Sequence, residues 1–230
     1  MLSDVPRHGG RVKYGILFLL LAIAIAVAVA RGGPWAWLLF YPAFSFGLVD
    51  AAYLFSAPGV FGKRFDGRRS RLGTLLVLPY VLYVSVVWHV VRLLSREPKT
   101  NTLNDELVLS RRLLEHELAA GIASVVDLTC EFTEPKDRWS LQSYLCHPML
   151  DGTGSTSNEI RELADEIIKL LKPILIHCAQ GHGRTGLFAA AVLIVSGEAQ
   201  TAADAIAMIQ AVRPGVELNK AQRLILEKIA

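Results

Sequence analysis

Cysteine is scarce in this chain, and its spacing argues against two structural roles. The 230 residues include only Cys130, Cys146 and Cys178. An odd number without framework spacing does not predict a disulfide scaffold. No Cys-x-x-Cys pair occurs, so the sequence offers no recognisable ligand set for zinc. We therefore expect neither a metal site nor a cofactor, and each thiol has to be considered individually.

Charge is also sparse, and it is unevenly distributed. Charged residues make up 20% of the chain and hydrophobic residues 52%, with a formal net charge of +3, so the chain is more apolar than an average soluble domain. The basic residues lie beside apolar runs, without the aromatic platform or motif of a nucleic-acid-binding protein. They are Arg7, Arg11, Lys13, Lys63, Arg64, Arg68, Arg69, Arg71, Arg92, Arg96 and Lys99. This distribution predicts contact with a lipid bilayer and no nucleic-acid partner.

Three apolar runs precede residue 95, and each is a candidate transmembrane helix. They cover residues 14–30, 35–55 and 72–94, which are long enough to approach or reach the thickness of a bilayer. If only the first two runs cross, both chain ends share one side with nearly all basic clusters; if all three cross, the ends lie on opposite sides. The sequence thus predicts a membrane region, 1–95, with two or three spans, and a globular domain, 96–230.

The globular domain alternates between helical and strand-like patterns. Helical patterns cover 111–120, 156–171, 185–195, 202–212 and 219–229, and apolar strand-like runs cover 122–129, 144–150 and 174–176. Thr156 and Glu159 have the spacing of a capping box, and Pro173 ends the helix that they begin. This alternation predicts an α/β fold with a central, mostly parallel sheet flanked by helices.

One loop carries the chemistry of the domain. Residues 177–186 read HCAQGHGRTG, and they connect a predicted core strand to a predicted helix. Backbone N–H groups at such a helix N-terminus favour phosphate, and glycine lets the backbone approach it closely. The guanidinium of Arg184 adds a planar fork for two phosphate oxygens. The predicted phosphate-binding residues are Ala179, Gln180, Gly181, His182, Gly183 and Arg184.

The same loop predicts a nucleophile. A cysteine at a helix N-terminus beside a cation is stabilised as its thiolate, which places Cys178 against the phosphorus of a bound phosphate. We expect the hydroxyl of Thr185 to donate a hydrogen bond to the Cys178 sulfur. We expect His177 to face away from the phosphate and to order the loop through a hydrogen bond.

The loop resembles the signature of the cysteine-dependent protein tyrosine phosphatases, His-Cys-x-x-Gly-x-x-Arg-(Ser/Thr). The short domain is similar to the dual-specificity branch, and the likeness extends to residues 125–129, to Arg213-Pro214 and to residues 219–222. It covers only the C-terminal half of the chain. The resemblance implies hydrolysis of phosphomonoesters on tyrosine, serine or threonine through a cysteinyl-phosphate, without a metal.

The resemblance also implies a general acid, an aspartate upstream of the nucleophile. Asp151 fits best, because it follows a predicted strand and is followed by Gly152 and Gly154, which permit movement. Asp137 and Glu134 are rivals for this role, whereas Asp127 lies within a strand and is expected to be structural.

The substrate and the mechanism have alternatives. A phospholipid phosphatase, such as one acting on phosphatidylglycerophosphate, is the first; Ala179 and His182 stand where lipid-directed relatives often carry lysine, which weakens a phosphoinositide substrate. A rhodanese-like sulfurtransferase and a non-catalytic phosphate-binding module are the others. Cys130 or Cys146 would either trap oxidised Cys178 as a disulfide or pack in the core.

The predicted location follows from the thiolate and the apolar runs. We expect an integral protein of the cell inner or plasma membrane. Its catalytic domain would lie on the cytoplasmic side, where reducing conditions preserve a thiolate.

Overall fold

A computed structural model describes residues 19–20, 23–25, 27–32, 38–135, 143–152 and 155–230. The C-terminal part is built on a five-stranded sheet with the order β1-β2-β5-β3-β4. The strands are β1 (Thr100–Thr102), β2 (Leu107–Arg111), β3 (Ser124–Thr129), β4 (Ser143–Met149) and β5 (Ile174–Cys178). All neighbouring strands are parallel except β1 and β2. The predicted α/β fold with a mostly parallel sheet is therefore confirmed for this part of the chain.

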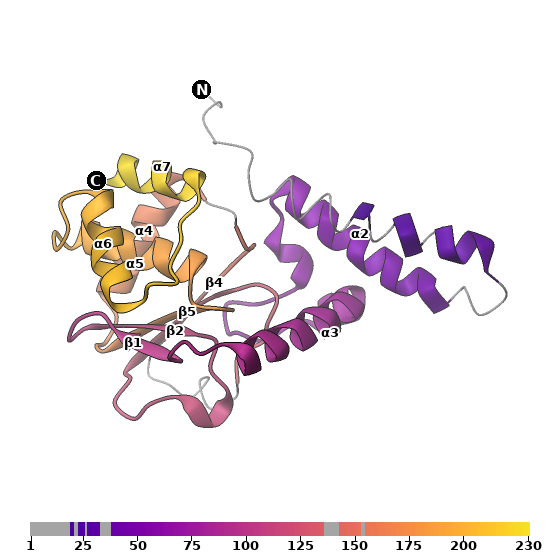
Figure 1. Cartoon of the computed structure of the whole chain (residues 1–230), viewed down its shortest axis with the longest axis horizontal. Coiled ribbons are helices and arrows are strands. Elements are labelled where there is room, and N and C mark those ends of the chain that lie inside the picture. Colours follow the sequence, from indigo (N-terminus) through magenta and orange to yellow (C-terminus); the bar gives the residue numbers. More distant parts are fainter. Residues whose placement is uncertain (1–18, 21–22, 26, 33–37, 136–142, 153–154) are drawn as a thin grey trace.

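Four helices gather together on one side of this sheet (Figure 1). They are α4 (Ser157–Ile168), α5 (Gly183–Val195), α6 (Ala202–Val212) and α7 (Lys220–Ile229). Helix α5 lies at the centre of the main hydrophobic core: Leu187, Phe188 and the alanines that follow are fully buried. Because α5 follows β5 directly, this packing fixes the loop between them.

The predicted elements agree with the structure in most places. Thr156 and Glu159 form the predicted capping box of α4, α6 has the predicted bounds, and Asn219 caps α7. The helix predicted over 111–120 is wrong. Arg111 ends strand β2, and only a short 3-10 turn follows at Glu115–Glu117. The sequence prediction also missed β1 and β2, because both strands are short and β1 is polar.

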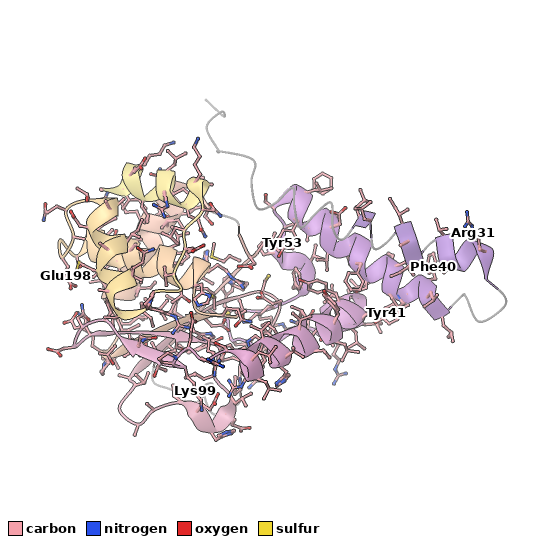
Figure 2. The ribbon with its side chains drawn as sticks, in the orientation of Figure 1. Arg31, Phe40, Tyr41, Tyr53, Lys99 and Glu198 are labelled. Carbon is pink, nitrogen blue, oxygen red and sulfur yellow. The ribbon has the colours of Figure 1, made fainter. Side chains whose placement is uncertain are left out.

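The N-terminal part contains two long helices joined by a bent connection, residues 56–70. They are α2 (Phe40–Phe55) and α3 (Arg71–Leu94), with a 3-10 turn, η2 (Pro58–Phe61), between them. Figure 2 shows Phe40 and Arg31 at the end that projects from the molecule and Tyr53 at the end nearer the sheet. Of the candidate span 14–30, residues 19–20, 23–25 and 27–30 are described and are helical, and the candidate 35–55 appears as the shorter helix α2.

In the part of the chain that the structure describes, α3 alone is long and apolar enough to cross a membrane. One such helix is weak support for a membrane span. Apolar side chains along α3 are nonetheless largely exposed, among them Leu72, Leu75, Leu82 and Val86. The other face of α3 is buried through Gly73, Val77, Tyr80 and Trp88.

The N-terminal part also packs closely against the five-stranded sheet. Lys63, in the bend after η2, is fully buried and donates hydrogen bonds to the carboxylate of Asp127 and to the carbonyl of Thr129 (2.7 Å). Trp88 Nε1 on α3 donates to the carbonyl of Ala179 (2.9 Å) in the loop after β5. Residues before and after position 95 therefore share a folded interior, including a core cluster in which Tyr53 and Tyr80 meet Leu150.

Candidate active site

The loop between β5 and α5 wraps around a buried sulfur. Cys178 is only 3% exposed, and the backbone N–H of Gly181 donates to its Sγ atom (3.3 Å). Gly181 has φ of +75°, and a Cβ there would lie 2.6 Å from the carbonyl oxygen of Ser110. Glycine is required here for both reasons, because an L side chain rarely adopts this φ and the neighbouring strand leaves no room. The sulfur thus lies at the N-terminus of α5, where an anion is stabilised.

Arg184 is held rigidly beside this loop. Its side chain is 1% exposed, and its Nη1 atom donates to Glu131 Oε2 (2.9 Å) and to the carbonyl of Met149 (2.9 Å), while Nη2 binds Glu131 Oε1. Burial alone would lower the pKa of Arg184, but the carboxylates of Glu131 and Asp151 outweigh it and raise that pKa well above its usual value. A permanent positive charge therefore faces the loop.

Asp151 lies at the end of β4, where the sequence predicted it. Its Oδ1 atom is 3.4 Å from Nε of Arg184, and its side chain is 49% exposed. Asn219 Nδ2 donates to the carbonyl of the following residue, Gly152 (3.2 Å), and so ties this loop to the start of α7. The structure thus brings Asp151 together with Arg184 and hence with the loop that holds Cys178.

The two rivals for the acid role are placed differently. Glu134 is 3% exposed, and its Oε2 atom lies 3.3 Å from Nε2 of His177, inside the sheet rather than at Arg184. Asp137 lies outside the described residues.

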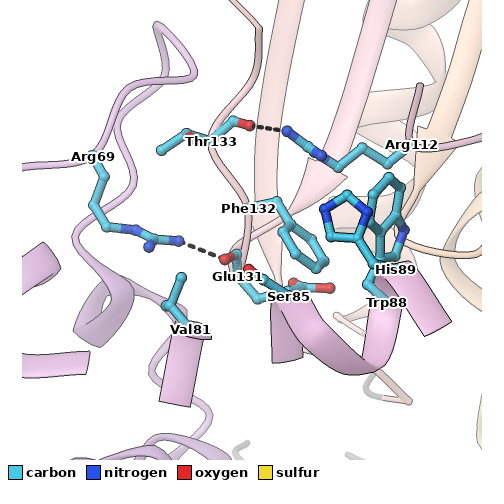
Figure 3. A pocket seen from close by; sticks show the side chains of 9 residues that line it. All are labelled: Arg69, Val81, Ser85, Trp88, His89, Arg112, Glu131, Phe132 and Thr133. Carbon is cyan, nitrogen blue, oxygen red and sulfur yellow. Dashed lines mark hydrogen bonds between the residues drawn. The ribbon is translucent and has the colours of Figure 1, made fainter. Parts of the chain in front are cut away.

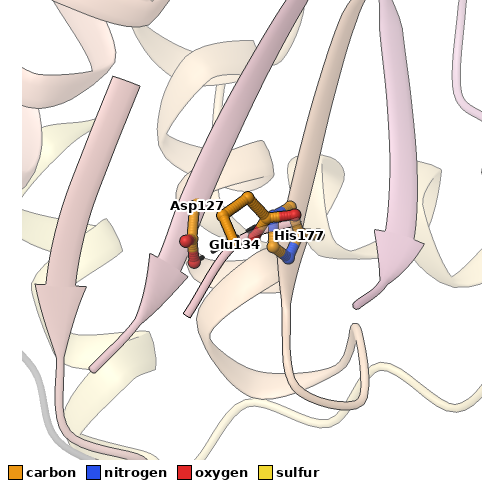
Figure 4. Close-up of side chains that lie close together, drawn as sticks. All are labelled: Asp127, Glu134 and His177. Carbon is orange, nitrogen blue, oxygen red and sulfur yellow. Dashed lines mark ion pairs between the residues drawn. The ribbon is translucent and has the colours of Figure 1, made fainter. Parts of the chain in front are cut away.

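His177 belongs to a buried cluster with two carboxylates. Figure 4 shows Asp127, Glu134 and His177 close together, and Nε2 of His177 lies 4.0 Å from Asp127 Oδ1 and 3.3 Å from Glu134 Oε2. These three side chains could hold a metal by composition, but Lys63 already binds the Asp127 carboxylate. The predicted hydrogen bond from His177 to the loop is not formed, since neither ring nitrogen has a hydrogen-bond partner among the described residues.

Asp127 is fully buried and takes a structural position. Burial would raise the pKa of Asp127, but Lys63 and His177 together with hydrogen bonds from Lys63 and Thr129 hold it well below its usual range. Tyr144 also donates to its Oδ2 atom (2.9 Å). Asp127 therefore stays ionised as the partner of Lys63.

The structure differs from two further sequence-based predictions. The hydroxyl of Thr185 is buried and has no hydrogen-bond partner among the described residues, so the predicted bond to the Cys178 sulfur is not formed. His182, the residue before α5, points to Glu97, with Nε2 and Oε2 2.7 Å apart. The imidazole of His182 is therefore paired with Glu97, and phosphate binding by His182 stays a prediction.

Sequence reasoning missed the residues that hold the loop from outside. Arg213, noted only as part of a family likeness, donates from Nε to the carbonyl of Gly181 (2.8 Å) and from Nη2 to that of Gln180 (3.1 Å). These bonds hold the carbonyls of Gln180 and Gly181 toward Arg213. Sequence reasoning also missed Glu131. Its position shortly after a predicted buried strand could have indicated a functional acidic residue.

The two remaining thiols are buried and reduced. Burial, with the nearby Glu131, raises the pKa of Cys130 well above its usual value. Burial likewise raises the pKa of Cys146 to about 11. Both thiols are therefore poor nucleophiles, which favours core packing over a role in trapping oxidised Cys178.

Comparisons with known proteins agree with this geometry. Residues 111–198, less than half of the chain, match the family described as "Polymorphic toxin system, DSP-PTPase phosphatase". A search of curated proteins found no match.

Solved structures give a consistent result for the C-terminal part. The crystal structure of Tk-PTP in its active form is 26% identical with a TM-score of 0.51, over 57% of this chain and 96% of that one. A single-residue variant of human DUSP28 is 20% identical with a TM-score of 0.50, over 58% and 94%. PTPMT1 in complex with PI(5)P is 15% identical with a TM-score of 0.50, over 57% and 94%. The last two similarities concern the fold alone.

The buried Cys178 at a helix N-terminus, the fixed Arg184 and these comparisons define a cysteine-dependent phosphatase. They support the protein tyrosine phosphatase superfamily, with a domain of the dual-specificity type. This result favours a phosphatase over a rhodanese-like sulfurtransferase.

Proposed function

We propose that this chain is a membrane-anchored phosphatase that hydrolyses phosphomonoesters on tyrosine, serine or threonine side chains through a cysteinyl-phosphate. The observation that carries the proposal is the convergence of three groups: Cys178 Sγ at the start of α5, Arg184 beside it, and Asp151 in contact with Arg184. A nucleophile, a fixed cation and an acid are the parts that such a two-step reaction requires.

In the first step, Cys178 Sγ attacks phosphorus and the bond to the ester oxygen breaks. Arg184 and the loop N–H groups bind the oxygens that carry the developing charge. Asp151 donates its proton to the departing oxygen. In the second step, Asp151 takes a proton from water, which attacks phosphorus and releases the Cys178 thiolate and inorganic phosphate.

The apolar surface of the N-terminal helices supports the anchoring part of the proposal. On α3, Leu72, Leu75 and Val86 are more than 60% exposed, and on α2 Phe55 is 81% exposed. Apolar surface of this extent is typical of contact with a membrane or a protein. We place the anchor in the inner or plasma membrane with the catalytic domain, 96–230, on the cytoplasmic side, where its thiol stays reduced.

A phospholipid phosphate is the second candidate substrate, and one contact favours it. Tyr53 of α2 and Tyr80 of α3 pack in the same cluster as Leu150, the residue before Asp151. An amphiphile lying along these helices would therefore bring its phosphate close to the acid.

Hydrolysis of a small aryl phosphate by the full-length protein tests the shared chemistry. Cys178→Ser should abolish turnover, and unchanged turnover in that variant refutes the mechanism. The full chain is needed because Lys63 and Trp88 contact the catalytic part. Phosphopeptides and phosphatidylglycerophosphate, supplied to the protein in bilayers, then separate the two substrates by their kcat/KM values.

A further inference from the structure

A polar cavity lies between α3 and the catalytic part, and its lining does not include Cys178 or Arg184. It has a volume of about 130 Å³, close to the ~150 Å³ of a cavity that accommodates benzene. Figure 3 shows its wall: Val81, Ser85, Trp88 and His89 come from α3, and Arg69 and Arg112 reach in from opposite sides. Four segments of the chain thus build it, the last of them being residues 131–133.

The wall is rich in positive charge. Arg69 Nη2 donates to the carbonyl of Glu131 (2.6 Å), while its Nε is buried without a hydrogen-bond partner among the described residues. The guanidinium of Arg112 lies over the rings of Trp88 and Phe132, 5.3 and 5.1 Å from their centroids. Glu131 is the acidic residue of the wall, and its carboxylate binds Arg184 instead.

This balance leaves a cationic cavity with further hydrogen-bonding side chains beside it. Burial lowers the pKa of Arg69 despite the nearby Cys130 and Glu131, and an anion bound next to its guanidinium would offset that cost. The hydroxyl of Ser85 and the imidazole of His89 add hydrogen-bonding groups from α3. Proteins commonly bind phosphate with arginine guanidinium groups and neighbouring hydrogen-bond donors.

We propose that this cavity binds a phosphate group as a second, non-catalytic site. The cavity is large enough for one phosphate ester but not for a nucleotide. Along α3 the cavity is flanked by Leu82 and Val86, which are 58% and 63% exposed, so a phosphate carried by a lipid headgroup would have apolar surface for its acyl chains. Inorganic phosphate offers the same chemistry without that surface.

A phosphate bound in this cavity would affect catalysis through Arg69 and Glu131. Arg69 binds the backbone of Glu131 on one side, and the Glu131 carboxylate holds Arg184 on the other. A phosphate bound by Arg69 would fix the segment 130–133 and with it the position of the catalytic guanidinium.

Equilibrium dialysis of the full-length protein in detergent with radiolabelled inorganic phosphate tests the site. Wild-type protein should bind two phosphates per chain, one at the loop of Cys178 and one at the cavity. Ser85→Leu fills the cavity with an apolar side chain and should reduce the stoichiometry to one, whereas the matched control Ser85→Ala should retain two. The phosphate that Ser85→Leu retains shows that the variant is folded. Arg69→Gln, which keeps the cavity open but removes a charge, should also bind one.

Competition then identifies the source of the phosphate. Dihexanoyl phosphatidylglycerol should displace the second phosphate at a concentration about ten-fold or more below that of glycerophosphoglycerol, since each buried methylene adds affinity; equal potency would assign the site to free phosphate. A single phosphate per wild-type chain, or two in Ser85→Leu, overturns the proposal.

Discussion

The carboxylate of Glu131 binds the guanidinium of Arg184 through two hydrogen bonds, one from each terminal nitrogen. Both residues are buried, at 6% and 1% exposure. Arg184 is therefore oriented by a residue that follows β3, whereas the loop that contains Cys178 follows β5.

Removing this carboxylate should destabilise the protein strongly. Glu131→Ala leaves a buried guanidinium without its charged partner, a change that costs about 3–5 kcal/mol. Urea unfolding of the full-length protein measures this change in unfolding free energy. Glu131→Gln keeps one hydrogen-bond acceptor and should therefore lose less stability than Glu131→Ala. Glu227→Ala, at an exposed acidic residue of α7, should stay within about 0.5 kcal/mol of wild type, and a Glu131→Ala value in that range would contradict the role assigned to the pair.

The Lys63 and Asp127 pair gives a second test by a double-mutant cycle. Lys63→Met leaves the fully buried Asp127 carboxylate without its cation, which should cost about 3–5 kcal/mol in unfolding free energy. Adding Asp127→Asn removes the orphaned charge, so the double variant should be more stable than Lys63→Met alone. Additive losses in the cycle would show that the two groups do not interact.

Asp151 makes a prediction that depends on the leaving group. Asp151→Ala should reduce kcat by about 100- to 10,000-fold, the range for a positioned proton donor. The loss should be smaller for aryl phosphates whose phenols are more acidic, because these need no proton to depart. Asp165→Ala, at an exposed residue of α4, should leave kcat unchanged. A uniform loss across leaving groups would remove Asp151 from this role.

Alanine variants of two glycines with positive φ distinguish the effect of backbone strain from the effect of displacing the loop of Cys178. Gly181 and Gly121 have φ of +75° and +92°, but only at Gly181 does an added Cβ meet other atoms, 2.6 Å from the Ser110 carbonyl. Both alanine variants should lose about 1–2 kcal/mol of stability from the left-handed backbone. Only Gly181→Ala should lower kcat/KM, by about 100-fold, because a displacement of the loop near 1 Å has that effect. Equal kcat/KM values for the two variants would contradict the close packing of the loop on β2.

Local patterns were sufficient to predict much of the catalytic part. The apolar run before Cys178, the glycines after it and the Thr156–Glu159 capping box act over a few residues, so β5, α5 and the start of α4 follow from sequence. Strand β2 was missed because its Leu107–Arg111 segment is short and leads into residues with helical spacing. Its partner β5 lies more than sixty residues later, and such a pairing leaves no local signal.

The residues that support the site were harder to predict for the same reason. Lys63 lies among basic residues that look like the flank of a membrane helix, yet it enters the core to meet Asp127, 64 positions away. The partners of Arg184 and Arg213 likewise come from distant segments. A lysine or an arginine looks the same in the sequence whether its side chain faces lipid headgroups or a buried carboxylate. Only the fold distinguishes the two cases.

The carbonyl of Ala179 accepts hydrogen bonds from Trp88 on α3 and from the backbone N–H of Arg112 (3.2 Å). Lys63 makes a second buried connection between the two parts. A chain cleaved in the short segment after α3 should therefore remain associated as two fragments. Separately expressed halves should restore a single enzyme when they are mixed, as in fragment complementation, rather than yield an independent catalytic domain.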